Sequence, residues 1–227
     1  MNILLAIDTA TEACSAALLA GDELIERWQL APRGHTQLLL PMIGAVMAEA
    51  GCTWSALDGI AFGRGPGAFV GVRIATACAQ GLAFAHDLPV APVSTLETLA
   101  YGAGRRQGAR QVFAAIDARM GEIYAAAWPL DADGWPQEPR LAECVTAASA
   151  LSLPGTWFGV GSGLAAAASA FDGRIAFSDR DPAALPHAAD VARLGRRLLL
   201  AGAGVSAAAA QPVYLRDEVA KKSAVRG

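Results

Sequence analysis

The apolar residues of the first hundred positions fall into runs of two kinds. Short, nearly continuous apolar runs predict strands, and longer stretches in which apolar side chains recur every three or four residues predict helices. In chain order, the pattern predicts strands over residues 2–8, 14–20 and 23–30, a helix over 36–50, a strand over 57–62, a helix over 70–85, a strand over 90–93 and a helix over 95–101.

The second half of the chain repeats this pattern in an abridged form. It predicts strands over 111–116, 122–128, 156–160 and 174–177, and helices over 164–170 and 187–200. A glycine-rich, charged segment at 102–108 predicts a connection between the two halves. We therefore expect an N-terminal domain over residues 1–103, a C-terminal domain over 104–216 and a mobile charged tail over 217–227.

This order of elements, three strands followed by alternating helices and strands, is typical of the actin-like (ribonuclease H-like) fold. Sugar kinases and heat-shock ATPases share that fold. The expected fold class is therefore α/β, with two related domains whose mixed sheets are flanked by helices. Such an analogy at the level of the fold does not by itself assign an activity.

A glycine-rich stretch from Gly63 to Gly67 (Gly-Arg-Gly-Pro-Gly) links the strand at 57–62 to the helix at 70–85. Glycine reaches positive φ at low cost and proline fixes its own φ, so the stretch predicts an irregular turn. A loop of this kind can bind phosphate through free N–H groups at the helix start. Its spacing, however, matches neither a P-loop nor a dinucleotide-binding fingerprint, and a tight turn is the favoured interpretation.

The helix predicted after this loop is apolar nearly all round. One face carries Val70, Ile74, Ala77, Cys78 and Leu82, and a second face carries Val72, Thr76, Ala79 and Ala83. Because such a helix must be covered on all sides, it is either a fully buried core helix or an interface helix. In the interface interpretation, a partner helix packs on the small residues of the second face and comes nearest at Ala79 and Ala83.

Composition limits the classes of function. A chain of 227 residues, 54% of them hydrophobic, can bury one large core or two modest ones. The net charge of −3 excludes a broad basic surface for nucleic acid, so we expect the isolated chain to bind RNA only weakly. Four cysteines without a CxxC pair predict reduced thiols. The N-terminus does not read as a secretory signal and no apolar run is long enough to span a bilayer, which predicts a soluble, cytoplasmic protein.

The segment Asp8-Thr9-Ala10-Thr11 resembles the Asp-x-Gly-x-Thr phosphate loop of actin-like ATPases. In those enzymes the Asp orients metal and water, and the Gly lets the backbone approach phosphate. Ala10 stands where that Gly belongs, and its Cβ would crowd the approach. An ATPase or phosphotransferase that uses Asp8 remains one alternative. A peptidase is a second alternative, although the sequence identifies no nucleophile–base arrangement and no pair of histidines at metal-ligand spacing.

Several motifs together resemble one family. The segments ILLAIDTAT with CSAALL, HTQLLLPMI, GPGAFVGVRIA, AAIDARMGEIYAA and PVYLR are similar, in this order and over nearly the whole chain, to the bacterial TsaB (YeaZ) family of tRNA threonylcarbamoyladenosine biosynthesis proteins. The resemblance implies a non-catalytic, actin-like subunit that forms a heterodimer with the enzyme TsaD, works with the ATPase TsaE and forms a homodimer when isolated. In that complex TsaD transfers threonylcarbamoyl from threonylcarbamoyl-AMP to the adenosine beside the anticodon of ANN-decoding tRNAs.

The resemblance also implies where chemistry is absent. TsaD carries a His-x-x-x-His metal pair, and the two positions align with Thr95 and Leu99 of this chain. We therefore expect metal only in the TsaD partner, and no catalytic residue, metal or cofactor in this chain. Whether ATP or ADP binds at the interface of the complex stays open, and tRNA is expected to bind only through the complex.

The glycine loop departs from the common family pattern GPGSFTGxRIG at Ala68, Val70 and Ala75. Losing the hydroxyls at Ala68 and Val70 argues against a phosphate role for the loop and leaves a packing role intact. The resemblance implies that the loop and the following helix bind the partner. The expected partner-binding residues are Gly65, Pro66, Gly67, Phe69, Val72, Arg73, Thr76, Ala79, Gln80 and Ala83.

Overall fold

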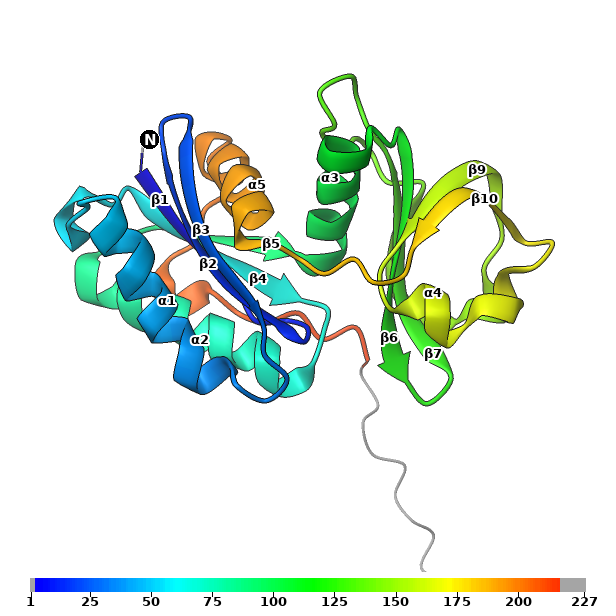
Figure 1. The fold of residues 1–227 in the computed structure, drawn as a ribbon, viewed down its shortest axis with the longest axis horizontal. Helices are drawn as coiled ribbons and strands as arrows, with labels where there is room; N and C mark the ends of the chain where they lie inside the picture. Colours follow the sequence, from blue (N-terminus) through cyan, green and yellow to red (C-terminus); the bar gives the residue numbers. More distant parts are fainter. Residues whose placement is uncertain (1–2, 217–227) are drawn as a thin grey trace, which may run out of the picture.

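The structure, a computed structural model, describes residues 3–216 and contains two five-stranded sheets (Figure 1). The strand order of the first sheet is β3-β2-β1-β4-β5, with β1 at its centre. Strands β1, β2 and β3 pair in antiparallel fashion, whereas β4 and β5 run parallel to β1. The bounds are Ile3–Asp8 for β1, Ala13–Ala20 for β2, Glu23–Leu30 for β3, Gly59–Gly65 for β4 and Val90–Ser94 for β5.

Helices cover both faces of this sheet. Helices α1 (His35–Glu49) and α2 (Phe69–His86) lie on one face, and α5 (Ala188–Leu200) lies on the other (Figure 1). Alternate side chains of β1 pack against the helices on the two faces of the sheet, because successive residues of a strand point to opposite faces. Leu5 and Ile7 join the core under α1 and α2, whereas Leu4 and Ala6 join the core under α5. Burial on both faces explains the continuous apolar runs.

The second sheet has the order β10-β9-β6-β7-β8, which repeats the topology of the first sheet with β6 at its centre. Helix α3 covers one face and the short helix α4 covers the other. The bounds are Thr95–Gln107 for α3, Gln111–Arg119 for β6, Glu122–Pro129 for β7, Leu141–Ala147 for β8, Leu153–Val160 for β9, Gly163–Ala166 for α4 and Ile175–Asp181 for β10. Short 3-10 turns lie at Trp54–Ala56, Ala148–Ala150, Ala168–Phe171 and Ala207–Ala209.

The helices divide between the sheets differently from the predicted boundary at residues 103/104. That boundary falls inside α3, which packs on the second sheet, and α5 from the C-terminal half packs on the first sheet. The predicted connection at 102–108 is helical up to Gln107, and Gly108, with φ of 68°, ends the helix. Gly102 permits close packing at this point of α3, since a methyl group on it would overlap the Arg106 side chain. The predicted tail at 217–227 lies outside the described residues.

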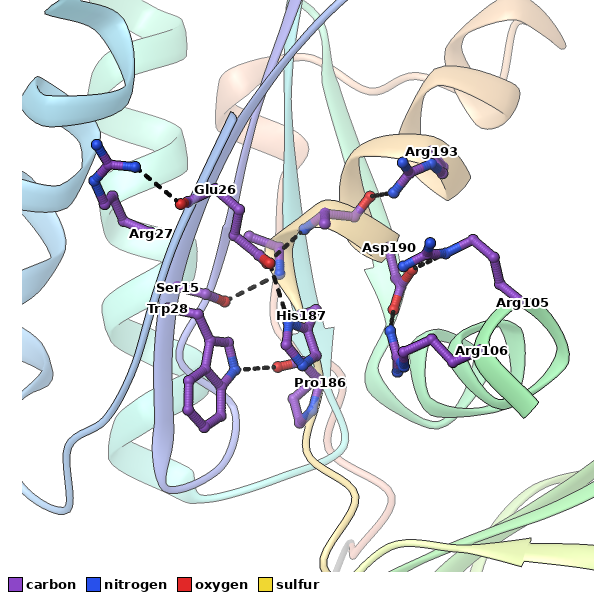
Figure 2. A network of polar contacts seen from close by, with 12 residues as sticks. Ser15, Glu26, Arg27, Trp28, Arg105, Arg106, Pro186, His187, Asp190 and Arg193 are labelled. Carbon is purple, nitrogen blue, oxygen red and sulfur yellow. Dashed lines mark hydrogen bonds and ion pairs between the residues drawn. The ribbon is translucent and has the colours of Figure 1, made fainter. Parts of the chain in front are cut away.

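We call the part of the molecule built on the first sheet, which includes α5, the first half, and the part built on the second sheet, which includes α3, the second half. An ion-pair cluster joins these two halves where α3 and α5 meet. Asp190, in the first turn of α5, is fully buried and accepts hydrogen bonds from Arg105 Nε at 3.1 Å and Arg106 Nη1 at 2.5 Å (Figure 2). Both arginines belong to α3, so the carboxylate bridges a helix of one half and a helix of the other. A buried carboxylate needs such partners, because an unpaired charge in the interior is costly.

A second cluster fixes the connection from β10 to α5. Glu26 of β3 accepts a hydrogen bond from the Ala189 N–H at 2.9 Å and lies 3.1 Å from His187 Nδ1 (Figure 2). Burial by itself would raise the pKa of Glu26, but these two hydrogen bonds lower it below its ordinary value. The Trp28 ring stacks on His187 and donates to the Pro186 carbonyl at 3.2 Å. The entry to α5 is therefore held against the edge of the first sheet.

Candidate functional site: the interdomain cleft and the outer face of α1 and α2

The glycine loop packs directly on the turn that follows β1. The Ala68 N–H donates to the Ala10 carbonyl at 2.8 Å, and the Thr9 hydroxyl donates to the Gly71 carbonyl at 2.7 Å. A methyl group on Gly67 would overlap the Ala10 carbonyl, and one on Gly71 would overlap the Thr9 carbonyl. These glycines therefore serve the close approach of two backbone segments, in agreement with the predicted packing role. The peptide bond between Gly65 and Pro66 is cis.

Asp8 is enclosed at the end of β1. Its side chain is 1% exposed, Oδ1 accepts from the Ala10 N–H at 3.0 Å, and Oδ2 has no hydrogen-bond partner among the described residues. Desolvation raises the pKa of Asp8 to about 7, against the opposing effects of the Ala10 hydrogen bond and of His187. Asp8 is not among the residues that line the cleft described below. The carboxyl group is thus not presented to a ligand in the cleft.

Thr95 and Leu99, the positions aligned with a metal pair, are buried in α3 at 0% and 2% exposure. Within residues 3–216, no group of three or more His, Cys, Asp or Glu side chains is placed to hold a metal ion.

A cleft of about 880 Å³ lies between the two halves. Its walls come from the β1–β2 turn and the start of α2 on one side, and from β6, Tyr124 and Ser162 on the other. The segment from Val213 to Arg216 forms a third wall. Aromatic rings and guanidinium groups both line the cleft, and its volume lies in the range of small-molecule sites.

Helix α2 buries the face that was expected to meet a partner. Val72, Thr76, Ala79 and Ala83 are all 4% exposed or less and pack toward the first sheet. In the isolated chain these four side chains are therefore covered by the protein's own fold, and their assignment to the partner-binding set stays a prediction. Their small side chains let α2 lie close to its own sheet, which the sequence could not distinguish from close approach to another helix.

The other predicted partner-binding residues lie around the start of α2. Gly65 and Pro66 are buried, and Gly67 is half-buried at the cleft. Phe69 is 53% exposed, Arg73 is exposed, and both line the cleft. Gln80 is half-buried, and its side-chain amide donates to the Ala210 carbonyl at 2.7 Å.

The outer face of α2 is exposed and apolar. Val70 is 67% exposed and Phe84 is 83% exposed, with the small residues Ala77 and Gly81 exposed between them. Helix α1 lies beside α2 on the same side of the sheet and exposes Leu40 at 60% (Figure 1). We call this surface the α1/α2 face; its members are Leu40, Pro41, Gly44, Ala45, Val70, Ala77, Gly81 and Phe84.

The contribution of α1 to this face was missed at the level of the sequence. A signal was available, because Glu49 and Arg73 are the only Asp, Glu, Lys or Arg residues in the two helices. A surface helix normally carries charged residues on its outer side. Exposed apolar faces without charged residues are common on association surfaces.

The cleft, the repeated sheet topology and the two helical layers define a two-domain protein of the actin-like fold. Residues 29–223 match the family model described as "TsaD: tRNA N6-adenosine threonylcarbamoyltransferase". The chain is 41% identical to the tRNA threonylcarbamoyladenosine biosynthesis protein TsaB of Escherichia coli K12, over 96% of both chains. It is 40% identical to the TsaB of Haemophilus influenzae, over 96% of this chain and 95% of the relative.

Two solved structures also match this chain over most of its length. The structure titled "YeaZ from Pseudomonas aeruginosa" superimposes with a TM-score of 0.87 at 44% identity, covering 95% of this chain and all of that one. A second structure, titled as an uncharacterized protein with similarity to peptidase YEAZ from Pseudomonas aeruginosa, gives a TM-score of 0.88 at the same identity and coverage. The chain belongs to the TsaB (YeaZ) family, as its motifs predicted.

Proposed function

We propose that this chain is a non-catalytic subunit of the machinery that makes threonylcarbamoyladenosine in tRNA. In this role it binds and activates TsaD, which transfers threonylcarbamoyl from threonylcarbamoyl-AMP to the adenosine next to the anticodon of ANN-decoding tRNAs. The observation that carries the proposal is 41% identity to the Escherichia coli TsaB over 96% of both chains. TsaE is the further partner, tRNA is contacted through the complex, and the cytoplasm is the proposed compartment. Within residues 3–216, none of the helices is long and apolar enough to cross a bilayer.

The α1/α2 face supports a role in association. It presents Phe84 and Val70 to solvent, with small residues between them that leave room for a partner helix. At Gly81, an added Cβ would meet no atom within 4 Å, so the centre of the face is open. We propose that TsaD docks on this face. A second copy of this chain would use the same surface, so the homodimer and the heterodimer would exclude each other.

The environment of Asp8 argues against the ATPase alternative. A phosphate-loop carboxylate must reach a metal-bound water, yet Asp8 is 1% exposed and does not line the cleft. Among the described residues, the peptidase alternative lacks a histidine that contacts a nucleophilic side chain, and the His86 ring stacks on Trp54. His35 Nε2 contacts the carbonyl oxygens of Thr11 and Ala13, and His187 contacts Glu26. For neither ring do the described residues supply a Ser, Thr or Cys side chain as partner.

The test is association with TsaD from the same source, followed by reconstituted formation of threonylcarbamoyladenosine with and without this chain. We expect co-elution in gel filtration and modification that depends on this chain. Phe84→Glu should weaken association at least about tenfold, which corresponds to about 1.4 kcal/mol. Leu200→Glu is the matched control, since Leu200 is also exposed, at 66%, but ends α5 on the opposite side of the sheet. Absence of co-elution by the wild-type chain would refute the proposal.

A further inference from the structure

The last described segment, residues 211–216, leaves the first half of the molecule from a fixed point. Ala210 is fully buried in the core beneath α2, and its carbonyl accepts the hydrogen bond from Gln80. The Val213 N–H then donates to the Arg64 carbonyl at 2.8 Å, at the end of β4. The start of this segment is therefore packed against the first sheet and α2, in the first half of the molecule.

Tyr214 attaches the segment to the first turn of α2. Arg73 Nε donates to the Tyr214 hydroxyl at 2.7 Å, and the rings of Tyr214 and Phe69 lie 5.8 Å apart. The guanidinium carbon of Arg73 lies 3.6 Å from the Phe69 ring centroid, within cation–π range. These three side chains form one cluster on the wall of the cleft.

Arg216 then reaches the second half of the molecule. It forms an ion pair with Glu122 of β7, and its guanidinium lies 3.4 Å from the Arg119 carbonyl and 3.6 Å from the Met120 sulfur. These residues belong to the β6–β7 hairpin, where Arg119 and Met120 have φ of 66° and 58°. Residues other than glycine rarely adopt positive φ. The contacts with Arg216 therefore help to hold the hairpin turn in this conformation.

The two covalent connections between the halves, from β5 to α3 and from β10 to α5, lie on the side where Asp190 joins α5 to α3 (Figure 1). Residues 211–216 cross on the side of the β6–β7 hairpin, along the cleft. A rotation of the halves about the α3–α5 junction would change the distance that this segment spans. We propose that residues 211–216 act as a latch, which sets the width of the cleft by tying the start of α2 to the β6–β7 hairpin.

The latch can be tested on the isolated chain without any partner, so its failure is separate from failure of the proposed function. Arg216→Ala and Glu122→Ala each remove the far attachment, and small-angle X-ray scattering on the monomer fraction measures the separation of the halves. We expect each variant to increase the radius of gyration beyond the spread of replicates. The double variant should add no further increase, because both changes break the same contact.

Arg174→Ala is the matched control, since this exposed arginine lies in the same half and no described residue forms a hydrogen bond or ion pair with its side chain. It should leave the radius of gyration unchanged, and circular dichroism should show all variants folded. Hydrogen exchange over 116–124 gives a second measurement. Faster exchange there without a change in radius would show that Arg216 stabilises only the hairpin, and would overturn the latch. An unchanged radius in both Arg216→Ala and Glu122→Ala would do the same.

Discussion

The carboxyl group of Asp8 lies against the α-carbon of Gly63, so close that a methyl group at residue 63 would overlap Oδ2. Asp8 is the last residue of β1, and Gly63 lies two residues before the end of the neighbouring parallel strand β4. This contact closes off the side chain that the sequence offered as a phosphate-site carboxylate. It also leaves an acidic group in the interior with a single hydrogen bond, from the Ala10 N–H.

The burial of Asp8 predicts a pH dependence of stability. The pKa of Asp8 rises from 3.8 to about 7 in the folded protein, so between these values the folded state binds more protons than the unfolded state. The free energy of unfolding should therefore fall as pH rises from about 4 to about 7, by at most about 4 kcal/mol, at 1.36 kcal/mol per pKa unit. Urea denaturation at pH 5 and pH 8 measures the part of this loss that falls above pH 5, about two thirds of it.

Asp8→Asn should remove most of that loss and be more stable than the wild type at pH 8. The exposed Asp22, in the β2–β3 turn, supplies the control: Asp22→Asn should keep the wild-type pH dependence. If Asp8→Asn loses as much stability between pH 5 and pH 8 as the wild type, the assignment of the buried carboxyl as the cause fails.

Two alanines of α2 predict opposite results for one substitution. Ala79 is fully buried in the core, so Ala79→Arg should destabilise the fold by several kcal/mol or prevent folding. Ala77 is exposed on the α1/α2 face, so Ala77→Arg should keep a melting temperature close to that of the wild type. Thermal unfolding followed by circular dichroism measures both. A folded, stable Ala79→Arg protein would contradict the assignment of the two faces.

Glycines of α2 give a second matched pair. A methyl group at Gly71 would overlap the Thr9 carbonyl, whereas one at Gly81 would meet no atom within 4 Å. Gly71→Ala should therefore lower the free energy of unfolding by about 1–3 kcal/mol through overpacking. Gly81→Ala should raise it by up to about 1 kcal/mol, because alanine is the better helix former. Denaturant titrations of the two variants decide the matter, and equal effects would contradict the close approach of α2 to the β1–β2 turn.

The pattern of apolar runs predicted most of the elements. The strand β3 begins and ends at Glu23 and Leu30, as the sequence predicted, because turn residues on one side and a loop on the other bound a short segment of mixed apolar and polar residues. The strand β8, at Leu141–Ala147, was missed because it is an edge strand with mostly half-buried side chains and no continuous apolar signal. The helix α3 was shortened in the prediction because glycine usually interrupts helices, whereas Gly102 and Gly104 lie inside this helix and pack closely against neighbouring groups.

The sequence by itself determined the fold class, the family and the density of small apolar residues in α2, because local periodicity and motif order are properties of the chain alone. Only the tertiary structure decided which face of α2 meets the sheet, that Asp8 is enclosed, and that residues 211–216 connect the two halves. Ala77 and Ala79 are the same residue two positions apart, and only the placement of the helix on the sheet makes one a surface residue and the other a core residue. The physical reason is that burial depends on contacts between residues far apart in sequence, such as Arg73 with Tyr214, and a local pattern does not encode which of two apolar faces those contacts will cover.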